Sequence, residues 1–173
     1  MDSDNKNNLR RIVIAAVFAA LVYSTTLIAI PLPRGNINFG ECCVLLCGIM
    51  LGPWGAVSAA VGAALADITL GYMIYVPATV VIKALTALAV YFLIKLFSGI
   101  FRQKYTLPAI IISSVIAEVV MVGGYFLYEL VLSQNLAVSA ATIPTNCMQA
   151  AAGIIAANII YAVLPGKIKH PIK

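Results

Sequence analysis

The chain has 173 residues, of which 62% are hydrophobic and only 10% are charged. Soluble domains carry about a quarter charged residues, so this composition excludes an ordinary soluble domain and indicates a protein embedded in lipid. The formal net charge is +5. Apart from Arg34, Lys83 and Lys95, the basic residues lie in the two tails and around Arg102 and Lys104, which is typical of membrane proteins rather than of a nucleic-acid-binding patch.

Apolar runs separated by prolines, glycines and polar residues predict six helices, and we expect residues 1–173 to form a single transmembrane domain. A membrane-spanning helix needs about 20 residues. The first run ends at Pro31 and Pro33 and is too long for the apolar core of a signal peptide, so we interpret it as a retained helix. The second run is the shortest and is expected to tilt or to span only part of the bilayer. The predicted helices cover residues 10–31, 41–52, 54–71, 77–99, 107–132 and 144–164.

The positions of lysine and arginine predict the orientation of these helices. With the N-terminus in the cytoplasm, the basic residues of both tails and of the connection between the fourth and fifth helices are cytoplasmic, and only Arg34 lies outside. We therefore expect an all-α integral membrane protein with six transmembrane helices and both termini in the cytoplasm.

Two ionisable residues, Asp67 and Lys83, flank the predicted turn between the third and fourth helices. A charged side chain inside a membrane span costs several kcal/mol unless it is paired, hydrated or functional. Tyr72 and Tyr75 lie in the turn between them. The pattern is consistent with a structural ion pair between Asp67 and Lys83, but the two tyrosines and the other polar groups on the same side favour a polar ligand site near the outer face.

The predicted orientation brings further polar side chains to the same outer half of the membrane. Glu41 begins the second helix, and Tyr125 lies near the outer end of the fifth. Asn146 and Gln149 are three residues apart and share one face of the sixth helix. These two amides either contact a ligand or form hydrogen bonds between helices, each worth about 1 kcal/mol.

Two polar features allow more than one interpretation. The loop that contains Arg34, Asn36 and Asn38 is either a solvated connection or a lid over the outer mouth. Glu118 lies near the middle of the fifth helix, where it is either a structural carboxyl group or a proton relay. The absence of a histidine from every predicted span favours the structural role.

Catalysis and metal binding are both disfavoured. The only histidine, His170, lies in the C-terminal tail, and Asp67 is the only aspartate in a predicted span. Intramembrane hydrolysis would need a Ser–His pair, two aspartates or a metal cluster. We therefore expect no enzymatic activity, no metal and no cofactor. The four cysteines form no Cys-x-x-Cys pair and are interpreted as inert thiols: Cys42, Cys43, Cys47 and Cys147.

The first helix carries alanines at a spacing of four residues, which lets helix backbones approach closely, either within the protein or against a partner: Ala15, Ala16, Ala19 and Ala20. The chain has no internal repeat of the kind found in inverted-repeat transporters.

The order and spacing of several motifs resemble the substrate-binding S components of energy-coupling factor (ECF) vitamin transporters, in the branch that includes riboflavin and hydroxymethylpyrimidine S components. The resemblance covers almost the whole chain. The motifs are Asn38-Phe39-Gly40-Glu41, Leu51-Gly52-Pro53-Trp54-Gly55, Ala64-Leu65-Ala66-Asp67, Gly71-Tyr72, Pro77-Ala78-Thr79, Ile82-Lys83, Glu118, Gly124-Tyr125-Phe126, Glu129, Ile143-Pro144, Asn146 and Gln149.

This resemblance implies the substrate-binding subunit of an ATP-driven importer in a prokaryotic cytoplasmic membrane. Such a subunit binds a water-soluble vitamin near its outer face, closes its first loop over it and associates with a transmembrane coupling subunit and two cytoplasmic ATPases. The chain lacks a phosphate-binding Gly-rich loop, so its partners would hydrolyse the ATP. The family's docking surface matches the alanines of the first helix, which become the expected partner contact.

The available side chains offer a carboxylate, an ammonium, amides and aromatic faces to a ligand. They favour a pyridine or pyrimidine, such as a vitamin B6 form or hydroxymethylpyrimidine, while riboflavin and pantothenate stay open. The alternatives are a stand-alone proton-coupled carrier and a membrane scaffold subunit. The expected ligand-binding residues are Asn36, Asn38, Glu41, Asp67, Tyr72, Tyr75, Lys83, Tyr125, Asn146 and Gln149.

Overall fold

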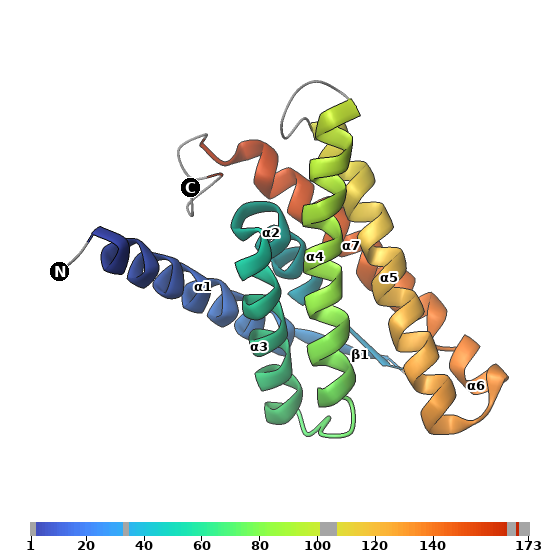
Figure 1. The fold of residues 1–173 in the computed structure, drawn as a ribbon. Coiled ribbons are helices and arrows are strands. Elements are labelled where there is room, and N and C mark those ends of the chain that lie inside the picture. The colour runs from blue at the N-terminus through green and yellow to red at the C-terminus, as the bar shows by residue number, and fades with distance from the viewer. Residues whose placement is uncertain (1–2, 33–34, 101–106, 166–168, 170–173) are drawn as a thin grey trace.

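The computed structural model describes residues 3–32, 35–100, 107–165 and 169 (Figure 1). Arg34, Arg102, Lys104 and His170 fall outside these residues. Within them lie six helices of 12 to 27 residues, as predicted, together with a five-residue helix and a β-hairpin that were not predicted. The elements are α1 Ser3–Leu27, β1 Ala29–Leu32, β2 Gly35–Asn38, α2 Gly40–Leu51, α3 Pro53–Thr69, α4 Val76–Ile100, α5 Leu107–Ser133, α6 Leu136–Ala140 and α7 Ile143–Val163.

The connection between the first two helices differs from the expectation of a helix to residue 31 followed by an open loop. Helix α1 ends at Leu27, and β1 pairs with β2 in an antiparallel hairpin in which Ile30 lies opposite Ile37. Proline has no N–H and drives the residue before it toward extended conformations. Pro31 is therefore compatible with strand β1 and not with a last helical turn.

The connection between α5 and α7 also holds more structure than the polar segment that was predicted there. The short helix α6 begins after Asn135, whose side-chain oxygen accepts hydrogen bonds from the backbone N–H groups of Ala137 and Val138. This N-cap satisfies donors that the first helical turn otherwise leaves unpaired.

Helix α2 is surrounded by other helices. It packs against α1, α3, α4 and α7, and every one of its residues except Cys43 is buried. Its 12 residues extend for about 18 Å, less than the thickness of a bilayer core. Gly52 then adopts φ = 62°, a backbone conformation that glycine reaches without strain, and Pro53 begins α3. The short, polar-ended α2 is therefore enclosed by protein rather than by lipid.

Four helical segments of the described residues are long and apolar enough to cross a membrane: Asn5–Leu27, Val76–Ser98, Leu107–Ser133 and Leu136–Val163. Their outer faces expose large apolar side chains, such as Val17, Phe92, Val119 and Ile155. The chain is thus a multi-pass membrane protein. Six spans with both termini in the cytoplasm stay a prediction, since α2 and α3 have only 12 and 17 residues.

The helix ends gather at two levels of the bundle. At one end lie the turn between α3 and α4, the end of α5 and helix α6, and the hairpin approaches the same end from α1 (Figure 1). The start of α1, the end of α7, the end of α4 and the start of α5 lie away from this end (Figure 1). The polar residues singled out in the sequence therefore meet at the end that carries α6.

Candidate ligand-binding site

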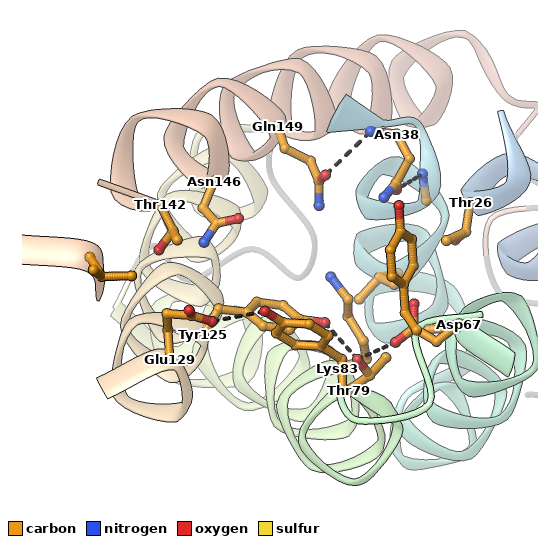
Figure 2. A pocket seen from close by; sticks show the side chains of 16 residues that line it. Thr26, Asn38, Asp67, Thr79, Lys83, Tyr125, Glu129, Thr142, Asn146 and Gln149 are labelled. Atoms are coloured by element: carbon orange, nitrogen blue, oxygen red, sulfur yellow. Dashed lines mark hydrogen bonds between the residues drawn. The ribbon is translucent and has the colours of Figure 1, made fainter. Parts of the chain in front are cut away.

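A cavity of about 440 Å³ lies at this end of the bundle. Its volume falls within the range of about 300–1,000 Å³ that is usual for small-molecule sites. Helices α1 to α7, strand β2 and the turn between α3 and α4 all contribute to it (Figure 2). The lining residues are Thr26, Asn38, Gly40, Val44, Ala63, Asp67, Tyr72, Tyr75, Thr79, Lys83, Tyr125, Glu129, Val138, Thr142, Asn146 and Gln149.

One wall of the cavity carries carboxylates held by hydroxyl groups. The Thr79 hydroxyl donates to Asp67 Oδ2 and lies 3.1 Å from the Tyr125 hydroxyl oxygen. The Tyr75 hydroxyl donates to Glu129 Oε2 at 2.9 Å. The two carboxylates thus stand at opposite ends of one polar row with their orientations set by neutral donors (Figure 2).

The opposite wall carries side-chain amides from β2 and α7 (Figure 2). The backbone N–H of Asn38 donates to Gln149 Oε1 at 3.2 Å, which ties the hairpin to α7. The Asn38 side-chain oxygen accepts from the backbone N–H of Gly40 at 2.9 Å, at the start of α2. Asn146 points into the cavity one turn before Gln149 (Figure 2). A ligand in the cavity would therefore lie between carboxylates on one side and amides on the other.

The ammonium of Lys83 reaches the cavity from α4 and forms an ion pair with Glu41 of α2. Glu41 is 0% exposed and also accepts a hydrogen bond from Gln149 Nε2 at 2.9 Å. The ion pair between Asp67 and Lys83 that the sequence allowed is therefore replaced by one between Glu41 and Lys83. Removing two charges from water is costly, and the additional donor from Gln149 helps to offset that cost.

A close approach between α2 and α7 makes this network possible. A Cβ atom at Gly153 would lie 2.6 Å from Glu41 Cβ, so only glycine fits there without displacing a neighbour. The approach brings Gln149, one turn earlier on α7, within reach of Glu41. On the cavity side, Lys83 Nζ lies 5.0 Å from the centroid of the Tyr125 ring, a cation–π geometry.

Of the ligand-binding residues predicted from the sequence, all but two line the cavity. Glu41 lies behind Lys83 rather than in the lining, and Asn36 belongs to β2 with its side chain outside the described part of the chain.

Four polar lining residues were not assigned to the site from the sequence: Thr26, Thr79, Glu129 and Thr142. Thr79 lies four residues before Lys83 and Glu129 lies four residues after Tyr125, so helical periodicity offered a signal for both. Thr26 and Thr142 carried no comparable signal, because only tertiary packing brings the end of α1 and the start of α7 to the cavity.

The predicted partner contacts on α1 divide into two groups. Ala15 is buried, and its carbonyl oxygen accepts a hydrogen bond from the Ser58 hydroxyl of α3 at 2.8 Å. Ala19, one turn later, is half-buried. Ala16 and Ala20 are exposed. Helix α1 thus packs within the protein through one alanine pair and presents the other pair on its surface.

A second cavity, of about 400 Å³, lies between α5 and α7 and is lined almost entirely by apolar side chains. Glu118 and Cys147 are the exceptions. Glu118 is 2% exposed, and neither of its carboxyl oxygens has a hydrogen-bond partner among the described residues. Within the same residues, no group of three or more His, Cys, Asp or Glu side chains could hold a metal ion.

Comparison with known proteins agrees with the resemblance seen in the sequence. Residues 6–165 match the model of the family described as ECF-type riboflavin transporter, S component. A protein from Pyrococcus woesei, described as an uncharacterized protein in gap 3'region, is 31% identical over 153 residues, which are 86% of this chain and 97% of that protein.

A solved structure supports the fold. It is described as the structure and mechanism of the S component of a bacterial ECF transporter, and it matches with a TM-score of 0.64 at 20% identity. The match covers 90% of this chain and 95% of the other. Because the family model spans nearly the whole sequence, the chain belongs to the family of ECF-type riboflavin transporter S components, which are transport subunits rather than enzymes.

Proposed function

We propose that this protein is the substrate-binding subunit of an ECF-type importer and that it captures a small, flat, water-soluble vitamin or vitamin precursor. The observation that carries the proposal is the 440 Å³ cavity at one end of the bundle, with carboxylates and amides on opposite walls. A pyridine or pyrimidine, such as a vitamin B6 form or hydroxymethylpyrimidine, fits this chemistry best. Riboflavin and pantothenate are the other candidates.

The cavity offers the two kinds of contact that a heterocycle needs. Tyr72, Tyr75 and Tyr125 present aromatic surface against which a flat ring can stack. Asn146 and Gln149 present amides that can donate to and accept from the edge of the ring. Polar groups of a ligand need such partners in a buried site, because burying a polar group without a hydrogen bond is costly.

The cavity is proposed to face the outside of a prokaryotic cytoplasmic membrane, with both termini in the cytoplasm. Lysines and arginines concentrate in the tails and in the segment between α4 and α5, as cytoplasmic segments do. The cavity lies at the end of the bundle that carries α6, away from the start of α1 and the end of α7 (Figure 1). In this orientation a vitamin enters from outside without crossing the protein.

Uptake would require a transmembrane coupling subunit and two cytoplasmic ATPases as partners. Ala16 and Ala20 are exposed on α1 at a spacing of one helical turn, which supports close approach of a partner helix there. Ala16→Trp or Ala20→Trp is expected to abolish vitamin uptake in cells while leaving binding to the purified protein unchanged. Ile155→Trp, at a site on α7 that is 62% exposed, is the matched control and should retain uptake. Loss of ligand binding in the α1 variants would place this surface within the protein.

Calorimetry on the purified chain, alone in detergent, tests the central proposal. The panel contains thiamine, 4-amino-5-hydroxymethyl-2-methylpyrimidine, pyridoxine, pyridoxamine, riboflavin and pantothenate. Tight binding of one compound without any partner or energy source is the expected result. Failure of the whole panel to bind would contradict vitamin capture.

A stand-alone proton-coupled carrier is the second candidate, because Glu118 is buried without a hydrogen-bond partner in the described part of the chain. Uptake that collapses with the proton gradient but survives ATP depletion would favour it. Uptake that requires ATP and the coupling subunit would exclude it.

A further inference from the structure

The charges around the ligand cavity are not balanced. Among the described titratable residues that line it, apart from the tyrosines, Asp67 and Glu129 are acidic and only Lys83 is basic. Whether the cavity attracts a cation or an anion therefore depends on how much of the Lys83 charge is available to a ligand.

The charge of Lys83 is already matched from behind. Its ammonium is ion-paired with Glu41, which is fully buried and held in place by Gln149. Glu118 of α5 also interacts electrostatically with the same ammonium. A carboxylate or phosphate on a ligand would have to compete with these groups, so Lys83 is a poor anion site.

Unlike Lys83, the two carboxylates on the cavity wall have only uncharged hydrogen-bond donors among the described residues. The hydrogen-bond donors to Asp67 and Glu129 are the hydroxyl groups of Thr79 and Tyr75, which carry no charge. A neutral donor fixes the direction of a carboxylate without cancelling its charge. Within the described residues neither carboxylate forms an ion pair, so the negative charge of its ionised form is available to a ligand.

The aromatic side chains of the cavity also favour a positively charged ligand. Tyr72, Tyr75 and Tyr125 line the cavity together with the two carboxylates. The face of an aromatic ring attracts cations, and the attraction strengthens when water is excluded. An enclosure of carboxylates and tyrosines suits an ammonium group or a positively charged ring, and opposes an anion.

We propose that the cavity selects heterocycles that carry an amino group or a positively charged nitrogen and rejects those that carry a carboxylate or phosphate. One of the two carboxylates, Asp67 or Glu129, receives the nitrogen, while the amides of Asn146 and Gln149 contact the edge of the ring. The inference rests on the proposed capture of a vitamin, and it narrows the class of substrate from flat polar rings to amine-bearing or cationic ones.

Three pyridines with a common ring test the sign of the selection. Pyridoxamine, pyridoxine and 4-pyridoxate carry an aminomethyl, a hydroxymethyl and a carboxylate group at the same ring position. Calorimetry on the full chain in detergent is expected to rank them in that order, with at least about tenfold between the first and the last. Thiamine and 4-amino-5-hydroxymethyl-2-methylpyrimidine are measured beside riboflavin, pantothenate and nicotinate, and the tightest binder of the whole set should carry an amino group or a cationic nitrogen.

The other possible results distinguish the proposed charge selection from the proposed vitamin capture. A neutral or anionic compound as the tightest binder would overturn the charge selection and leave vitamin capture standing. Equal affinity for the three pyridines would do the same. Binding by no compound of either panel would overturn both.

Variants that remove the charge of one carboxylate test whether Asp67 and Glu129 cause the preference for amines. Asp67→Asn and Glu129→Gln keep the side-chain shape and remove the charge, so at least one of them should weaken the tightest amine by about tenfold or more. Asp4→Asn, in the first turn of α1, is the matched control and should bind as the unmodified chain does. Melting temperatures identify any variant that fails to fold, and the remaining carboxylate then carries the test. Unchanged selectivity in both variants would overturn the inference.

Discussion

The two cavities share helices α5 and α7 but differ in chemistry. The first is lined by carboxylates, hydroxyls and amides, whereas the second is apolar apart from Glu118 and Cys147. Neighbouring residues of α7, Asn146 and Cys147, line different cavities. Successive residues of a helix point about 100° apart, so one helix can serve an aqueous ligand site on one side and an apolar groove on the other. The polar cavity is the one that we propose binds a water-soluble ligand.

Each cavity has one buried glutamate next to it, and the two glutamates differ in the partners that they contact. Glu41, behind the polar cavity, has an ion-pair partner and a hydrogen-bond donor. Glu118, beside the apolar cavity, has no hydrogen bond to either oxygen within the described residues. Four pairs of variants test whether the two regions differ in energy as they do in geometry, from the largest expected effect to the smallest.

Removal of the two carboxyl groups should have unequal effects on stability. Glu41→Met leaves the Lys83 ammonium buried without its partner, which typically costs about 3–5 kcal/mol. Glu118→Met removes a group that makes no hydrogen bond within the described residues and acts on Lys83 without forming an ion pair with it, so it should cost less than Glu41→Met. Unfolding in mixed detergents measures both, and Glu41→Met/Lys83→Met should recover most of the loss. Equal losses in the two single variants would show that the Glu41–Lys83 pair has no special structural role.

Filling each cavity should affect ligand binding differently. Val138→Trp places a large ring in the polar cavity and is expected to weaken the tightest-binding vitamin at least about a hundredfold, or about 2.7 kcal/mol. Ala151→Trp fills the apolar cavity instead and should leave the affinity unchanged. Calorimetry on both purified variants makes the comparison. A similar loss in Ala151→Trp would mean that the ligand occupies the groove between α5 and α7.

Two glycines test the packing beside each cavity. Gly153→Ala forces a methyl group against Glu41 and should lower the free energy of unfolding by roughly 1–3 kcal/mol. Gly123→Ala, in the lining of the apolar cavity, meets no atom within 4 Å and should be neutral or slightly stabilising, because alanine favours helix. Thermal unfolding in detergent distinguishes them. A neutral Gly153→Ala would contradict the close approach of α2 and α7.

Asn146 and Cys147 give the smallest expected difference. Asn146→Ala removes one amide from the polar cavity and should weaken binding about three- to tenfold, which corresponds to about 1 kcal/mol for one hydrogen bond. Cys147→Ala, on the other side of the same helix turn, should leave the affinity as it is. Calorimetric titration of the tightest-binding vitamin measures both affinities. Parallel losses would indicate that α7 as a whole, rather than the side chain of Asn146, supports the site.

The helices were more predictable than the connections between them. Long apolar runs identify membrane helices from composition alone, because a lipid-embedded backbone must satisfy its own hydrogen bonds. The hairpin was missed because its strands are only four residues long, and because Pro31 within β1 and Pro33 directly after it in the sequence suggested an open loop. Helix α6 was missed because its five residues follow a polar stretch with no apolar period.

The candidate site was predictable in its residue types and less so in its pairings. Polar side chains in an apolar chain stand out, so Asp67, Lys83 and Asn146 could be found without coordinates. The partner of Lys83 could not be predicted. Asp67 is much closer to Lys83 in the sequence than Glu41 is, so the sequence suggested the wrong ion pair. The sequence also could not predict which alanines of α1 pack inside the protein and which stay exposed, because their spacing is compatible with either.

The sequence by itself determined that this is a helical membrane protein, which apolar runs form its long helices, and which family its motifs indicate. These properties follow from local composition and spacing. The tertiary structure decided that Lys83 pairs with Glu41 and that Ala15 packs inward while Ala16 stays exposed. It also decided that threonines from α1, from α4 and from the N-cap of α7 complete the cavity. These features depend on how the helices rotate and approach one another, and close packing between distant segments sets both.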